Sequence, residues 1–236
     1  MGELHRPTIA ILASGSGTTA EAFIHATQDE IVDAEVGLVI CDVESAPIFG
    51  VVARLNSQYN LDIQTRLING KLFPKGRQER GQTLEESNEI ARIVSFENIS
   101  LIALMGYMRI VAEKGDLMSE YGWKPEYSVN EPESDGIFNV RMLNTHPGIL
   151  PQTADTFGEN TQKKVIELGL DHTNHTVHGV AAGVDSGPIY AEHKVPVFNN
   201  DTPGKLFKRV QRVEKAHLPI DIDKFLKEQA KFKAAA

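Results

Sequence analysis

Three polar residues that could act on a carbonyl group stand at the ends of predicted strands. Asn144 and His146 lie two positions apart at the end of the segment 140–145, so on a strand they share one side. An amide donor and an imidazole placed in this way can polarise a carbonyl and stabilise an oxyanion. Asp185 lies in the turn 184–188, where its carboxylate could hold an imidazole in its charged form or pass protons through water. Each residue alone is also common in ordinary loops and turns, so only the set predicts carbonyl chemistry.

A glycine-rich loop follows the first predicted strand. Backbone N–H groups of such a loop and of the helix that it opens bind anions, and nearby hydroxyl groups add donors. The predicted phosphate site consists of Gly15, Ser16, Gly17, Thr18 and Thr19. The spacing also matches the dinucleotide-binding fingerprint, with Asp42 at the end of the second strand where a ribose-binding acid belongs. A nicotinamide or flavin oxidoreductase is therefore a second interpretation of this loop. A third is a turn that only links the strand to the helix and binds no ligand.

Two further groups of polar residues lie near the C-terminal strands and helix. His172, His175 and His178 look like a metal-binding tract, but residues 175 and 178 of a strand point to opposite faces. One ion cannot readily bind both imidazoles, so we expect no zinc site. We expect His178 instead to pack beside the catalytic residues or to hold them in position. Glu214 lies beside the apolar face of the last helix, where it could meet a substrate amine or hydroxyl or be a charge at the edge of the core.

The spacing of apolar residues predicts an α/β protein that would position these groups. The predicted strands cover 8–13, 36–40, 61–65, 101–105, 140–145, 173–180 and 188–197, and the predicted helices begin near 18 and cover 46–55, 81–97, 158–168 and 202–217, with a frayed helix at 224–236. Strands that alternate with helices imply parallel pairing and right-handed crossovers. We therefore expect a Rossmann-like open, mostly parallel twisted sheet with helices on both faces and an antiparallel C-terminal strand pair.

The periodicity fails between residues 114 and 139, where Gly, Pro and acidic residues concentrate. We interpret 114–139 as an inserted surface excursion within a single domain that covers 1–236. The segment precedes the strand of Asn144 and His146, so it could cover the active site.

Composition excludes several classes of protein. The chain has 236 residues with 41% hydrophobic and 24% charged residues, which is typical of a globular protein large enough for a full α/β core. Its formal net charge of −8 argues against broad nucleic-acid binding, which needs clustered Lys and Arg. With neither a signal segment nor a membrane-length apolar run, we expect a cytoplasmic protein without membrane contact. Cys41 is the single cysteine, so neither an internal disulfide nor a cysteine zinc cage can form.

Four ordered motifs resemble the folate-dependent formyltransferases, most closely those that formylate glycinamide ribonucleotide in purine synthesis. The motifs lie at 13–18, 106–111, 144–151 and 177–188, and the resemblance covers nearly the whole chain except 114–139. It implies transfer of the formyl group of 10-formyltetrahydrofolate, a cosubstrate, to the amine of glycinamide ribonucleotide without a metal. The dipeptide His146-Pro147 favours the purine branch over formyltetrahydrofolate hydrolases, methionyl-tRNA formyltransferases and sugar-nucleotide formyltransferases.

The resemblance also implies a role for each matching residue. Asn144, His146 and Asp185 would be catalytic, with Asn144 and protonated His146 stabilising the oxyanion while Asp185 keeps His146 charged. The implied substrate-binding residues are Gly15, Ser16, Gly17, Thr18, Thr19, Arg77, Met108, Pro147, Gln211 and Glu214, with Arg77 as an accessory phosphate ligand. The implied folate-binding residues are Met108, Arg109, Ile110, Val111, Asn144, Val184 and Asp185.

Several departures from the purine branch leave alternatives for the acceptor. Thr19 stands where those enzymes commonly have Asn, Ser186 replaces Gly, and Asn160 and Gln162 replace a His-rich segment. The alternatives are formyl transfer to another small amine such as an amino sugar nucleotide, a Rossmann NAD-dependent oxidoreductase, and a silent ligand-binding or scaffold protein. We expect small-molecule partners, no nucleic acid, and a monomer or homodimer.

Overall fold

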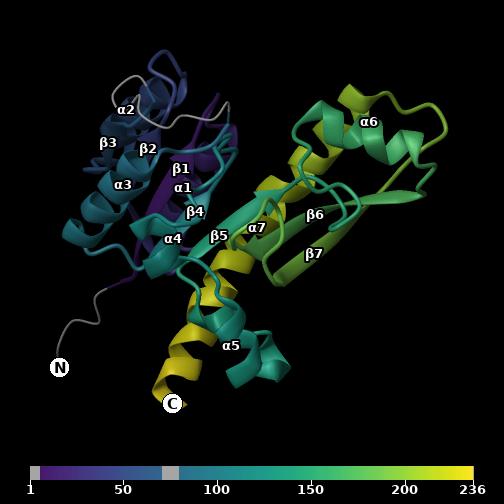
Figure 1. The fold of residues 1–236 in the computed structure, drawn as a ribbon. Helices are drawn as coiled ribbons and strands as arrows, with labels where there is room; N and C mark the ends of the chain where they lie inside the picture. The colour runs from purple at the N-terminus through teal and green to yellow at the C-terminus, as the bar shows by residue number, and fades with distance from the viewer. Residues whose placement is uncertain (1–5, 71–79, 236) are drawn as a thin grey trace.

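A seven-stranded sheet forms the centre of the computed structural model, which describes residues 6–70 and 80–235 (Figure 1). The strand order is β3-β2-β1-β4-β5-β6-β7. The parallel part consists of β1 (Thr8–Ala13), β2 (Glu35–Cys41), β3 (Gln64–Leu67), β4 (Leu101–Leu104) and β5 (Met142–His146). β6 (His172–Gly179) pairs antiparallel with both β5 and β7 (Ile189–Pro196). The predicted Rossmann-like sheet with an antiparallel C-terminal pair is confirmed.

Helices cover both faces of this sheet. α1 (Thr18–Gln28), α2 (Ile48–Tyr59) and α7 (Pro203–Ala235) bury apolar residues on one face, and α3 (Leu84–Phe96) and α4 (Asp116–Tyr121) do so on the other. In β1, Ile9 and Ile11 belong to the first core while Ala10 and Leu12 belong to the second, because successive side chains of a strand point to opposite faces. Burial on both faces explains why the central strands are continuous apolar runs.

Helix α3 begins three residues later than predicted from apolar spacing. Thr83 is its N-cap and accepts a hydrogen bond from the Glu86 backbone N–H at 3.1 Å. The Glu86 carboxylate in turn accepts from the Thr83 backbone N–H at 2.7 Å, which completes a capping box. The cap fixes the start of the helix, so residues 81–83 stay outside it.

Helix α7 is much longer than predicted. We expected it to end near His217, but it continues unbroken to Ala235, although Pro219 inside it removes a backbone hydrogen bond. Leu218, Ile222 and Phe225 are buried in the core beside the sheet, and this burial offsets the lost hydrogen bond. Figure 1 shows α7 running along the sheet from α6 (Glu159–Glu167) at one end to the neighbourhood of α5 (Pro125–Asn130) at the other.

Residues 114–139 fold into short helices. These are α4, α5 and two 3-10 turns, η1 (Pro132–Ser134) and η2 (Ile137–Asn139). Leu117 and Ile137 are buried in the two cores, whereas α5 and η1 bury no residue. Among the described residues, no helix combines the length and the apolar character that crossing a membrane requires.

Candidate active site

The loops that follow β1, β4 and β5 meet at a pocket of about 350 Å³ at the carboxyl edge of the sheet. The strand order reverses between β1 and β4, and ligands of open α/β sheets bind at such a reversal. Two hydrogen bonds hold the loops together: the Ser14 backbone N–H donates to the Gly106 carbonyl at 3.1 Å, and the Met108 N–H donates to Ser14 Oγ at 2.8 Å. The sheet therefore supplies a rigid frame for the pocket.

The three proposed catalytic residues lie in contact in this pocket. The Asn144 amide donates to Asp185 Oδ1 at 3.3 Å, and His146 Nδ1 lies 3.5 Å from Asp185 Oδ2. The side chain of His146 is 3% exposed and that of Asp185 is 10% exposed. β5 positions the first two residues and the turn between β6 and β7 supplies the third, so residues about forty positions apart in sequence converge on one side of the pocket.

Hydrogen bonds indicate which ring nitrogen of His146 carries the proton. Its Nε2 lies 2.9 Å from Thr153 Oγ1, and the Thr153 hydroxyl donates to the Ile149 carbonyl at 2.8 Å. The hydroxyl oxygen must therefore accept from Nε2–H, which leaves Nδ1 with a lone pair on the side of Asp185. Burial lowers the pKa of His146 from 6.5 to about 4, although the Asp185 carboxylate acts to raise it. The imidazole is neutral at pH 7, in contrast to the charged ring expected from the resemblance, because burial outweighs the carboxylate.

A buried neutral imidazole makes stability depend on pH. Between about pH 4 and 6.5 the unfolded chain binds a proton on this ring that the folded chain does not, so the free energy of unfolding should rise with pH across that window. Urea denaturation of the wild type and of His146→Gln at several pH values measures this contribution as the difference between the two. A difference that stays constant from pH 4 to 7 would contradict the depressed pKa.

His178 holds Asn144 in place from the adjacent strand β6. Its Nδ1–H donates to the Gly179 carbonyl at 2.8 Å, so Nε2 accepts from the Asn144 amide at 3.0 Å. Both amide hydrogens of Asn144 are then used, one by His178 and one by Asp185. The Asp185 contact is the longer of the two, so it is the one that a stronger acceptor would replace.

Asp185 is held in an unusual backbone conformation, with φ at 51°. Its Oδ2 also accepts from the Asp155 backbone N–H at 3.1 Å. Burial acts to raise the pKa of Asp185, but the polar groups around the carboxylate, which include the Asp155 N–H, hold it below its ordinary value. The carboxylate is therefore charged at neutral pH beside a neutral imidazole.

The glycine-rich loop forms the opposite wall of the pocket. Residues 15–19 all line it. Gly17 has φ at 72°, and a Cβ there would lie 2.7 Å from Ile48 Cγ1 of α2, so a side chain at this position is excluded. Gly17 is the N-cap of α1 and has no side-chain cap bond, so the first N–H groups of this helix border the pocket.

Arg80 places a cation at the border of the pocket, whereas the predicted phosphate ligand Arg77 lies outside the described residues. Arg80 lines the pocket, pairs with the exposed Asp155 carboxylate at 3.0 Å and stacks over the Phe157 ring at 4.8 Å. Sequence reasoning missed both Arg80 and Phe157, because no motif surrounds them. Their position depends on how residues 80 and 157 meet across the pocket.

The predicted folate-binding segment lines the pocket from Met108 to Val111, and Val184 lines it from the other side. The Ile110 N–H donates to the Arg80 carbonyl at 2.8 Å, and the Gln82 N–H donates to the Ile110 carbonyl at 2.9 Å. These bonds hold the segment against residues 80–82. The segment offers the apolar surface that a flat aromatic ligand needs.

Arg109 belongs to this segment, but its guanidinium is bound inside the protein. Nη2 donates to Glu86 Oε2 at 2.7 Å and to the Gly81 carbonyl at 2.6 Å, and the two charged side chains are 6% and 2% exposed. The ion pair joins the pocket loop to the cap of α3. The guanidinium therefore serves the structure of the loop.

Replacing Arg109 by Met should lower the free energy of unfolding by about 3–5 kcal/mol, because the Glu86 carboxylate would remain buried without a cation, with only the Thr83 backbone N–H left to bind it. Urea denaturation measures the change. The matched control is the double variant Arg109→Met/Glu86→Gln, which leaves no unpaired charge and should lose less. If the Arg109→Met variant keeps its stability but binds folate poorly, the guanidinium contacts the ligand and does not serve the structure of the loop.

Glu214 enters the pocket from α7 together with Gln211. Its carboxylate accepts from the Thr145 hydroxyl at 2.9 Å and from the Thr19 hydroxyl at 3.3 Å. Burial raises the pKa of Glu214, and the two hydroxyls partly oppose this effect. Thr19, one of the departures from the purine branch, thus has a defined partner in the structure.

Two other sequence expectations have clear outcomes. The segment 114–139 does not line the pocket, so the expectation that it could cover the active site is wrong. It leads into the amino end of β5, whereas Asn144 and His146 stand toward the carboxyl end. Asp42 is also absent from the lining of the pocket, which removes the ribose-binding acid on which a dinucleotide site depends.

Pro147, a predicted substrate-binding residue, lines the pocket, and the Gln162 side-chain amide donates to its carbonyl.

Comparison with known proteins identifies relatives of this chain. A family model described as "Formyl transferase" matches residues 136–222. The chain is 30% identical over 217 residues to the trifunctional purine biosynthetic protein adenosine-3 of Homo sapiens, covering 92% of this chain but 18% of that protein. The chain therefore spans less than a fifth of the length of its trifunctional relatives. It is 26% identical to phosphoribosylglycinamide formyltransferase of Bacillus subtilis (strain 168), covering 92% of this chain and 93% of that one.

Solved structures agree with this comparison. Phosphoribosylglycinamide formyltransferase from Bacillus Halodurans is 28% identical with a TM-score of 0.72, and the match covers 93% of this chain and 95% of that one. Glycinamide ribonucleotide transformylase 1 from Symbiobacterium toebii is 25% identical with a TM-score of 0.75, covering 96% and 90%. The likeness extends over nearly the entire chain in both cases.

Proposed function

We propose that the chain belongs to the formyl transferase family, whose model matches residues 136–222, and that it transfers the formyl group of 10-formyltetrahydrofolate to the amine of glycinamide ribonucleotide. The observation that carries this proposal is the contact of Asn144, His146 and Asp185 in a pocket whose opposite wall is an anion-binding loop. An amide donor can stabilise the oxyanion of acyl transfer, and a buried imidazole beside a carboxylate can take the proton of the attacking amine. Relatives named phosphoribosylglycinamide formyltransferase support the choice of acceptor.

The lining of the pocket offers a separate binding surface to each substrate, on opposite sides of the catalytic residues. The phosphate of the acceptor binds the N–H groups and hydroxyls of residues 15–19 at the start of α1. Glu214 and Gln211 bind the middle of the acceptor. The folate ring system lies against Met108–Val111 and Val184, so that its formyl group reaches Asn144.

The neutral imidazole of His146 serves as the proton acceptor of the reaction. The acceptor amine attacks the formyl carbon, and the carbonyl oxygen gains negative charge as the tetrahedral intermediate forms. The Asn144 amide donates to this oxygen in place of its longer bond to Asp185. His146 Nδ1 takes a proton from the attacking nitrogen, and Asp185 at 3.5 Å stabilises the imidazolium. Collapse breaks the bond between the formyl carbon and the folate nitrogen, which receives the proton.

A panel of acceptors tests this assignment. Tetrahydrofolate release from 10-formyltetrahydrofolate is followed with glycinamide ribonucleotide, with an amino sugar nucleotide, and with neither. We expect release only with glycinamide ribonucleotide. Release with the amino sugar nucleotide alone would keep the chemistry and reject the acceptor, and equal release without an acceptor would indicate hydrolysis.

A further inference from the structure

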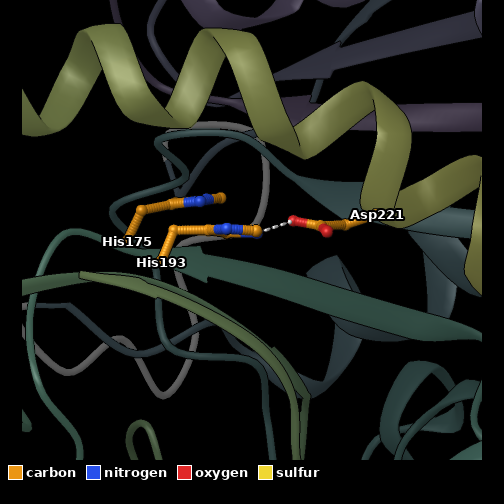
Figure 2. A group of neighbouring side chains, drawn as sticks. All are labelled: His175, His193 and Asp221. Carbon is orange, nitrogen blue, oxygen red and sulfur yellow. Dashed lines mark hydrogen bonds and ion pairs between the residues drawn. The ribbon is translucent and has the colours of Figure 1, made fainter.

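Two imidazoles and a carboxylate meet on the face of the sheet that α7 covers, and none of the three lines the pocket (Figure 2). His175 of β6 and His193 of β7 are direct cross-strand partners, and Asp221 projects from α7. One nitrogen of each ring and one carboxylate oxygen lie within 4.8 Å of one another. Figure 2 shows the two rings side by side, both directed toward the Asp221 carboxylate. Three elements therefore supply one group of ligand atoms.

His175 has a buried lone pair without a partner. Its Nε2 lies 2.8 Å from Thr145 Oγ1, and the Thr145 hydroxyl gives its hydrogen to Glu214. Nε2 therefore carries the ring proton, and Nδ1 is left as an acceptor. Nδ1 has no hydrogen-bond partner among the described residues, and the residue is 0% exposed. An unsatisfied buried acceptor costs free energy, so this nitrogen needs a ligand that nothing in the described protein provides.

His193 and Asp221 complete the arrangement. His193 Nε2 lies 2.8 Å from Asp221 Oδ2, and the His193 side chain is 24% exposed, which gives a solute access to the group. The ring of His217 stacks on His193 with centroids 4.0 Å apart and fixes its orientation. Asp221 is 7% exposed, and a buried carboxylate is stabilised by a cation.

We propose that His175, His193 and Asp221 bind one divalent transition-metal ion of the borderline class, such as Zn²⁺. Two imidazole nitrogens and one carboxylate oxygen are three of the four donors of a tetrahedral zinc site, and the solvent-accessible side beside His193 leaves the fourth position for water. The ion takes the place of the His193 proton that now points at Asp221, and that proton moves to the other ring nitrogen. Bound there, the ion cross-links β6, β7 and α7.

This proposal revises the expectation that the histidine tract binds no metal. That expectation compared His175 with His178, which do lie on opposite faces of β6. The second imidazole comes instead from His193, which antiparallel pairing places next to His175. The proposal is independent of the formyl-transfer assignment, because the three ligands lie outside the pocket.

Cobalt and zinc binding to the whole chain tests the site. After removal of metals with EDTA, Co²⁺ is titrated and its visible d–d absorption recorded, and Zn²⁺ is added to displace it. We expect one Co²⁺ per chain, and affinity lower by at least about 10-fold in both His193→Gln and Asp221→Asn. The matched control is His172→Gln, which removes a partly exposed imidazole of the same strand that pairs with Asp171, and this variant should bind as the wild type does.

A second measurement on the unchanged chain guards against variants that fail to fold. Imidazole ¹⁵N–¹H spectra of the wild type are recorded with and without Zn²⁺. The nitrogen signals of His175 and His193 should shift together at one equivalent while those of His172 stay in place. Binding that is absent, or that is equally strong in the His193 and Asp221 variants, overturns the proposal, as does a spectrum in which the His175 signals do not move.

Discussion

Replacing Asp185 by Asn should lower the turnover number by about 10²- to 10⁴-fold while the chain keeps its fold and binds both substrates. Asn is nearly isosteric with Asp but carries no charge, so it cannot stabilise the imidazolium that forms when His146 takes the proton from the amine. The carboxylate touches Asn144, lies 3.5 Å from His146 and accepts from the Asp155 N–H, so its loss affects the whole catalytic set. Steady-state kinetics and substrate titration measure the two quantities separately.

The control for Asp185→Asn is Asp155→Asn. Asp155 is a neighbouring carboxylate that does not line the pocket, and its side chain is 68% exposed and pairs with Arg80. Its contact with Asp185 is made by its backbone N–H, which the substitution keeps. Turnover should therefore change little in the control. Near-normal turnover in Asp185→Asn would reject the role of the carboxylate.

Replacing Asn144 by Ala should lower turnover by about 10²- to 10³-fold, with a smaller effect on substrate affinity. His178 holds the amide in place, and the amide hydrogen that now binds Asp185 turns to the oxygen that becomes negative. The loss should appear in kcat, since the interaction strengthens as charge develops.

Asn174→Ala is the matched control for this variant. Asn174 is a buried asparagine on the neighbouring strand, outside the pocket, with its amide bound to Glu192 at 2.8 Å. Its replacement should affect stability more than kcat. Equal losses of kcat in the two variants would show that damage to the sheet, and not loss of the amide donor, explains the effect.

Much of this architecture follows from local patterns in the sequence. The apolar runs of β1 and β4 predict central strands, because only strands covered on both faces can be apolar throughout. Alternation of strands and helices predicts the parallel part of the sheet, and the carboxyl ends of parallel strands meet at one edge. These local patterns are therefore sufficient to predict that Asn144, His146 and the glycine-rich loop share one edge of the sheet.

Features that depend on contacts between distant residues could not be predicted in this way. Pro219 indicates a helix end, and only the core beneath α7 explains why the helix continues. Arg109 lies in a pocket motif, yet the position of Glu86 decides where its guanidinium binds. The pairing of His175 with His193 depends on the register of two antiparallel strands, which is set by the turn between them and by the core.

The protonation state of His146 also could not be predicted from residue types, because it depends on how deeply the folded chain buries the ring. His146 and Asp185 together suggest an ion pair from sequence, because an adjacent carboxylate favours the charged imidazole. The folded chain encloses the ring so completely that burial is the larger effect on its pKa. The same two residues therefore form a neutral base beside a carboxylate.

The most direct test of formyl transfer is to follow the formyl carbon itself. The wild-type chain is incubated with 10-formyltetrahydrofolate carrying ¹³C in the formyl group and with glycinamide ribonucleotide, and the reaction is observed by ¹³C NMR. We predict that the label leaves the folate and appears as a formamide on the glycinamide amine, with one tetrahydrofolate released for each formamide formed. Label that stays on the folate, or that appears as free formate in equal amounts with and without the acceptor, would contradict formyl transfer.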